Sequence, residues 1–164
     1  MAGAGSMQGS DFDRRGWRVF AADPGSLAWA AAAMPLARAA LAAPGGDWRA
    51  GGTWFVGLDA LGNDATGRVG GVALTGAALT ATTRRFGPQI WHPAQLSVMR
   101  PGYPRPDEGE SPAAQAFRRN RDAAHVDGVI ALGPDKRRFV REPHGFVLGI
   151  ALGRADAQAA PLVV

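Results

Sequence analysis

The stretch that decides the fold is Thr53-Trp54-Phe55-Val56-Gly57-Leu58, a short run rich in aromatic and aliphatic residues, as is typical of a β-strand. Gly62-Asn63-Asp64, which follows it, has the composition of a turn. Four further runs have strand character: 67–74, 90–99, 129–132 and 146–152. Because these runs do not alternate regularly with helical segments, they favour an antiparallel sandwich or barrel over a doubly wound parallel sheet.

The residues before this stretch predict one long helix over 24–43. Asp23-Pro24 supplies an acceptor side chain for the helix N-terminus and a proline at the first helical position. Alanine gives the segment strong helix propensity, and Pro44-Gly45-Gly46 ends it. Pro35 predicts a kink or a restart within the helix. A short strand is expected earlier, at 17–20, after a turn at Gly16.

Length and composition are those of a globular protein. The 164 residues suit a single domain over 11–164, preceded by a flexible N-terminus at 1–10. The chain is 46% hydrophobic and 20% charged. The fold class we expect is mainly β with an N-terminal helix (α+β), in the form of a double-stranded β-helix of the jelly-roll or cupin-like type, incomplete at its C-terminus.

Charge, cysteine content and hydropathy exclude several classes of function. The net charge is only +4 and the arginines are spread along the chain, so no nucleic-acid partner is expected. The absence of cysteine excludes disulfides, thiolate zinc sites and a cysteine nucleophile. No apolar run reaches the ~18 residues of a membrane span. We therefore expect a cytoplasmic protein with no membrane partner, and the oligomeric state stays open.

The tripeptide His125-Val126-Asp127 is the strongest chemical signal in the sequence. Side chains two residues apart on an extended segment point to the same side, so an imidazole and a carboxylate face one point. This pair is two thirds of the 2-His-1-carboxylate triad of non-haem Fe(II) oxygenases, and it predicts metal ligation by His125 and Asp127. The alternative is a surface turn, because Asp127-Gly128 is also a common hairpin dipeptide.

Four further residues are candidates for binding a cosubstrate or substrate. Gln95 and Ser97 have period-two spacing on the expected strand, so both could face a pocket or, equally, the solvent. Tyr103 belongs to a long lid-like loop at 100–124 that ends in a short helix, and it is either a lid aromatic or a turn anchor. His144 is a pocket-lining residue, a third metal ligand, or an ordinary packed side chain.

The chain resembles the phytanoyl-CoA dioxygenase-like family of the Fe(II)/2-oxoglutarate-dependent dioxygenase superfamily. The likeness lies in the order of three motifs. Phe12-x-x-x-Gly16-Trp17-x-Val19 is similar to the family's opening strand, and Ala124-His125-Val126-Asp127-Gly128 is similar to its metal motif. The segments 146–152, 155–157 and 161–164 resemble the strand, acidic turn and strand that precede the family's distal histidine.

The resemblance implies Fe(II) as cofactor, 2-oxoglutarate as cosubstrate and hydroxylation of a small organic substrate. The family's third ligand, a histidine after the last of these motifs, and the basic residue that follows it lie beyond Val164. We therefore expect a truncated chain that holds iron weakly and is inactive as a fragment. The alternative function is a non-catalytic β-sandwich module for binding or interaction, without a working metal site.

Overall fold

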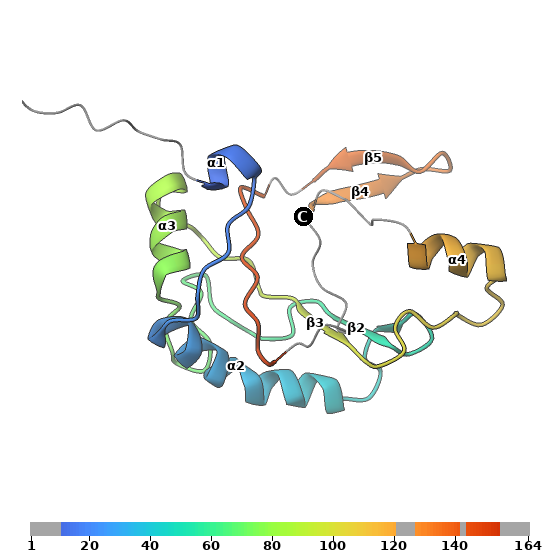
Figure 1. Cartoon of the computed structure of the whole chain (residues 1–164), viewed down its shortest axis with the longest axis horizontal. Helices are drawn as coiled ribbons and strands as arrows, with labels where there is room; N and C mark the ends of the chain where they lie inside the picture. Colours follow the sequence, from blue (N-terminus) through green and yellow to red (C-terminus); the bar gives the residue numbers. More distant parts are fainter. Residues whose placement is uncertain (1–10, 121–126, 142–143, 155–164) are drawn as a thin grey trace, which may run out of the picture.

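The computed structural model describes residues 11–120, 127–141 and 144–154 (Figure 1). Its helices are α1 (Asp11–Arg15), α2 (Pro24–Ala42), α3 (Ala77–Phe86) and α4 (Pro112–Asn120). Its strands are β1 (Trp48–Arg49), β2 (Trp54–Gly57), β3 (Leu96–Met99), β4 (Val129–Leu132) and β5 (Arg137–Val140). The described residues thus mix helix with small antiparallel sheets, and they contain more helix than strand and no closed barrel. None of their helices has the length and apolarity needed to cross a membrane.

The long N-terminal helix is confirmed as α2, and its start follows from the sequence. The Asp23 carboxylate accepts a hydrogen bond from the Ser26 backbone N–H at 2.9 Å, and the Ser26 hydroxyl accepts one from the Asp23 N–H at 3.0 Å. This reciprocal capping satisfies N–H groups that the first helical turn leaves without partners. The helix continues through Pro35 without a restart. It buries Trp29, Ala33 and Ala37, which lie four residues apart on one face.

The core lies between α2 and one face of a three-stranded antiparallel sheet in the order β1-β2-β3. In the central strand, Phe55 pairs with Trp48 on one side and with Val98 on the other, so these three side chains share a face. This face packs against Trp29, Ala33 and Ala37 of α2, together with Leu96 of β3. The prediction of a strand at 53–58 is confirmed as β2.

Three predicted strands are wrong or shorter than expected. Residues 17–20 follow helix α1 without joining a strand, and Val19 is 79% exposed. Residues 67–74 form only a bridge between Val69 and Val72, because Gly70 and Gly71 adopt positive φ angles and turn the chain there. The strand expected at 90–99 exists only as β3, since Pro93 has no N–H to donate to a ladder.

Two elements were not expected from the sequence. Helix α3 begins after Gly76, which has no side chain to cap it, and the missing cap comes from Asp23, whose carboxylate accepts a hydrogen bond from the Ala77 N–H at 2.8 Å. Residues 137–140, for which the sequence predicts no strand, form β5 and pair with β4 from Val129↔Val140 to Leu132↔Arg137. The short helix predicted at the end of the 100–124 loop is confirmed as α4.

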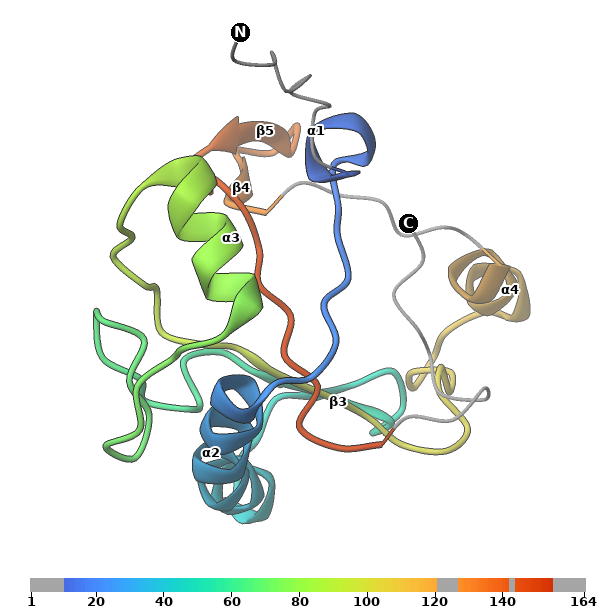
Figure 2. The same cartoon turned by 60° about the vertical axis from the view of Figure 1, so that its left-hand side comes forward.

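The segment 146–152 is extended but joins no sheet in the described structure. Leu148, Ile150 and Leu152 are half-buried against the core, while the residues between them are exposed, which is the alternation of a strand. No backbone hydrogen bond joins this segment to another described residue. Figure 2 shows it running from the end of the β4–β5 hairpin past α3 towards α2.

Candidate functional site

The sheet face that points away from α2 gathers polar and aromatic side chains. We call Arg49, Trp54, Val56, Ser97 and Met99 the open sheet face, because each alternates in its strand with a side chain that packs against α2. Val56, at the centre of this face, is buried, whereas Ser97 beside it is exposed. Strand β2 pairs Trp54 with Arg49 on one side and with Met99 on the other. In Figure 1, α2 lies on one side of this sheet and the β4–β5 hairpin lies on the other.

Two of the predicted binding residues, Ser97 and Tyr103, meet at Trp54 on this face. The Trp54 indole Nε1–H donates a hydrogen bond to the Ser97 hydroxyl at 2.9 Å. The Tyr103 ring lies edge-on to the indole, with 6.4 Å between ring centroids. Gln95 precedes β3 and is exposed, as is Ser97. In the described structure, both side chains are exposed to solvent.

The cation on the open sheet face, Arg49, is paired with a carboxylate. The Arg49 guanidinium lies 2.6 Å from the Asp47 carboxylate and 5.7 Å from the centre of the Trp54 ring. The hydrogen bond from Arg49 holds the pKa of Asp47 below its ordinary value and raises the pKa of Arg49 in turn. On the opposite face of the sheet, the Arg100 guanidinium stacks on Trp48 at 3.8 Å. Both charges are therefore fixed in place beside aromatic rings.

The loop between β3 and α4 is braced against the sheet. The Asp107 carboxylate accepts a hydrogen bond from the Gly51 N–H at 2.7 Å, and the Thr53 hydroxyl accepts one from the Arg105 N–H at 3.3 Å. Arg118 of α4 forms an ion pair with Glu110, which lowers the pKa of that carboxyl, and donates to the Arg105 carbonyl at 2.9 Å. The loop is thus held at both ends, next to the open sheet face.

The predicted metal motif is described only in part. His125 lies outside the described residues, and Asp127 is exposed at the turn that begins the β4–β5 hairpin. Within the described ranges, no group of three or more histidine, aspartate, glutamate or cysteine side chains is arranged to hold a metal ion. The chemistry of the donor pair still suits Fe(II), because an imidazole and a carboxylate two residues apart supply two ligands of a facial triad.

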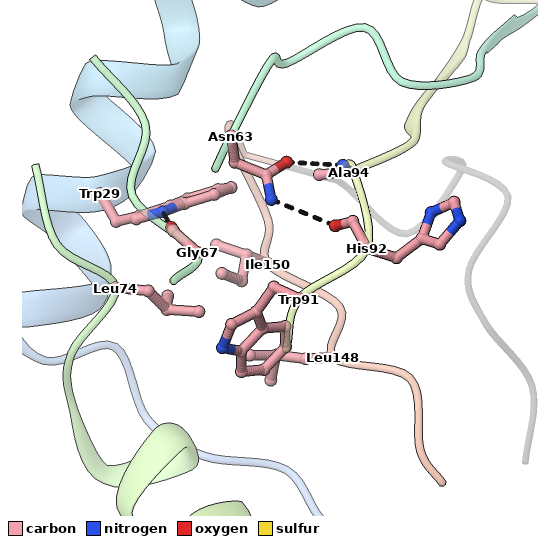
Figure 3. A pocket seen from close by; sticks show the side chains of 9 residues that line it. All are labelled: Trp29, Asn63, Gly67, Leu74, Trp91, His92, Ala94, Leu148 and Ile150. Atoms are coloured by element: carbon pink, nitrogen blue, oxygen red, sulfur yellow. Dashed lines mark hydrogen bonds between the residues drawn. The ribbon is translucent and has the colours of Figure 1, made fainter. Parts of the chain in front are cut away.

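His144 lies beside His92 at the surface of the described part of the chain. Its ring is exposed, and its centroid lies 6.3 Å from that of His92. His92 borders a cavity of about 60 Å³ between α2 and the 146–152 segment, which is lined mainly by apolar side chains (Figure 3). The cavity has room for a few water molecules, whereas pockets for organic ligands measure about 300–1,000 Å³. We therefore do not assign the substrate to it.

Sequence reasoning missed Trp54, the residue around which the candidate site is organised. The signal was present in the alternation of Trp54 with Phe55 along β2, since one of two neighbouring aromatics on a strand must point away from the core. No known protein family, curated protein or solved structure matches this chain.

Proposed function

We propose that this chain is an Fe(II)/2-oxoglutarate-dependent oxygenase-like protein of the double-stranded β-helix type, whose reaction is hydroxylation of a small organic substrate. The observation that carries the proposal is the open sheet face. A jelly roll consists of two sheets packed face to face, so the sheet face not covered by α2 is the one that would meet the second sheet. Polar side chains on that face would then line its interior.

In this proposal, His125 and Asp127 hold the iron, and Ser97 and Gln95 bind the far carboxylate of 2-oxoglutarate. When bound, the metal and cosubstrate supply the oxidising chemistry that protein side chains lack. The chain's own contribution is to orient and enclose. Trp54 fixes the Ser97 hydroxyl by its hydrogen bond at 2.9 Å, and the loop after β3 is held in place by the hydrogen bond from the Gly51 N–H to Asp107.

Metal titration tests the donor pair. Mn(II) serves as a redox-silent substitute for Fe(II), and the wild-type chain is expected to bind one equivalent in calorimetry. His125→Ala and Asp127→Asn should each abolish this binding. Asp135→Asn is the matched control, because Asp135 lies in the turn of the same β4–β5 hairpin and should leave it unchanged. Equal binding by the wild type and His125→Ala overturns the assignment.

The β4–β5 hairpin favours a second candidate, the non-catalytic interaction module. Ile130, Phe139 and Val140 are 43%, 44% and 65% exposed, and exposed apolar strands are common at protein–protein contacts. A module of this kind would show no metal binding that depends on His125. The same titration therefore separates the two functions.

A further inference from the structure

Three segments that are far apart in the sequence bring two histidines and one carboxylate together. His92 lies in the irregular segment before β3, His144 lies just before the extended segment 146–152, and Asp59 follows β2. The two imidazole centroids are 6.3 Å apart, with the rings tilted by 46°. The Asp59 carboxylate lies 4.0 Å from Nδ1 of His92. All three side chains are exposed, so solvent ions reach them directly.

The backbone at His92 is held rigidly by one asparagine. The Asn63 side-chain amide donates a hydrogen bond to the His92 carbonyl at 3.1 Å and accepts one from the Ala94 N–H at 2.6 Å. Figure 3 shows both bonds, and it shows the His92 imidazole pointing away from the cavity that Asn63 and Trp91 line. The His92 ring thus points outwards from a backbone segment that Asn63 holds in place.

The position of the His92 ring also selects its tautomer. Nδ1 lies 3.2 Å from the Pro93 carbonyl oxygen, which can only accept a hydrogen bond, and it faces Asp59 as well. These two acceptors favour the proton on Nδ1, the nitrogen that faces them. A carboxylate or carbonyl behind the protonated nitrogen is the usual arrangement for a metal-ligating histidine.

His144 is positioned by the aromatic residue two places after it. Phe146 stacks on Phe86 with 5.1 Å between ring centroids and lies edge-on to Trp91 at 5.6 Å. Because Trp91 directly precedes His92, the same contact that anchors the C-terminal segment also sets the distance between the two histidines. The pair is therefore tied to the core on both sides.

We propose that His92 and His144 form a two-histidine site for a divalent transition metal such as Zn(II), with Asp59 orienting His92 and water completing the coordination. With Zn–N bonds of about 2.0–2.1 Å, two imidazoles on a tetrahedral ion have ring centroids roughly 5 Å apart. The observed 6.3 Å requires the exposed rings to close by about 1 Å, which side-chain rotation provides. Imidazole suits Zn, Cu and Ni better than Mg or Ca.

The chain contains three histidines in all, which makes the test unusually clean. In the His125→Ala chain only His92 and His144 remain, so an imidazole NMR spectrum contains two sets of signals. Titration with Zn(II) is expected to shift both sets together at one stoichiometric point. Shift of one set alone, of neither, or of the two at different metal concentrations overturns the proposal.

Calorimetry of the full chain with Zn(II) separates this site from the proposed iron site. In the His125→Ala background, His92→Ala and His144→Ala should each weaken binding by at least about 10-fold, and Asp59→Asn by up to about 10-fold. His125→Ala alone should leave the two-histidine site intact. If His125→Ala removes all Zn(II) binding, the two-histidine site is refuted and the proposed iron site stands. If His92→Ala and His144→Ala have no effect in the His125→Ala background, the two-histidine site is refuted as well.

Discussion

Replacing Trp29 with phenylalanine isolates the contribution of one buried hydrogen bond to the fold. Trp29 is 5% exposed, and its Nε1–H donates to the Gly67 carbonyl at 2.7 Å inside the core. Phenylalanine keeps an aromatic ring but leaves this buried carbonyl without a partner, which costs about 1–3 kcal/mol. The smaller ring also enlarges the adjoining cavity by roughly 40 Å³, which adds about 1 kcal/mol.

Together these terms predict that Trp29→Phe lowers the free energy of unfolding by about 2–4 kcal/mol, a large part of the total for a small domain. Urea denaturation followed by far-ultraviolet circular dichroism should show the midpoint falling by roughly 1–2 M. Trp54→Phe is the matched control, because its indole hydrogen bond at 2.9 Å to Ser97 is exposed. A midpoint for Trp29→Phe equal to or above that of Trp54→Phe refutes the reasoning.

Asp23 caps two helices at once, so Asp23→Ala should lower the melting temperature and the helical signal of both α2 and α3, whereas Asp23→Asn, which keeps one acceptor oxygen, should lower them less. Hydrogen bonds from the N–H groups of Ser26 and Ala77 hold the pKa of Asp23 below its ordinary value of 3.8. The contribution of the ionised carboxylate to folding stability is therefore complete above pH 3.8 and is lost as the pH falls through the lower folded-state pKa. Acidification should thus destabilise the wild type more than Asp23→Asn. Gly67→Ala should destabilise more than Gly71→Ala, because both glycines have φ near +80° but only a Cβ at 67 lies within 3.4 Å of Trp91 and Leu74; equal melting temperatures would contradict this crowding.

Local chemistry made the first half of the fold predictable. The Asp23-Pro24 start and the Pro44-Gly45-Gly46 end defined α2 to within one residue, because capping and helix termination act through neighbouring residues. The run at 53–58 gave β2 for the same kind of reason, since its composition alone favours an extended chain.

Elements that depend on distant partners were not predictable in this way. Helix α3 takes its N-terminal cap from Asp23, 54 residues earlier, and no motif next to Gly76 reveals it. Strand β5 contains two arginines and resembles a loop, and only its pairing with β4 makes it a strand. Segment 146–152 has the alternation of a strand without a hydrogen-bonded neighbour among the described residues.

In the candidate site, too, features set by neighbouring residues were predictable and contacts between distant segments were not. The period-two spacing of Gln95 and Ser97 can be seen in the sequence because it is local, and the structure shows that both side chains are exposed. The sequence did not show that Trp54 and Tyr103 would gather around Ser97, since those contacts join β2, β3 and the following loop. The proximity of His92 to His144 was equally hidden, because it joins segments more than 50 residues apart.

The most direct test of the central claim is whether 2-oxoglutarate binding depends on metal at His125. Calorimetric titration of 2-oxoglutarate into the wild-type chain should give binding with Mn(II) present and none after chelation, because in the proposed site the cosubstrate would bind through the metal. His125→Ala should show no binding under either condition, whereas His92→Ala should behave as the wild type. Binding of 2-oxoglutarate that is the same with and without Mn(II), or that survives in His125→Ala, would contradict the account.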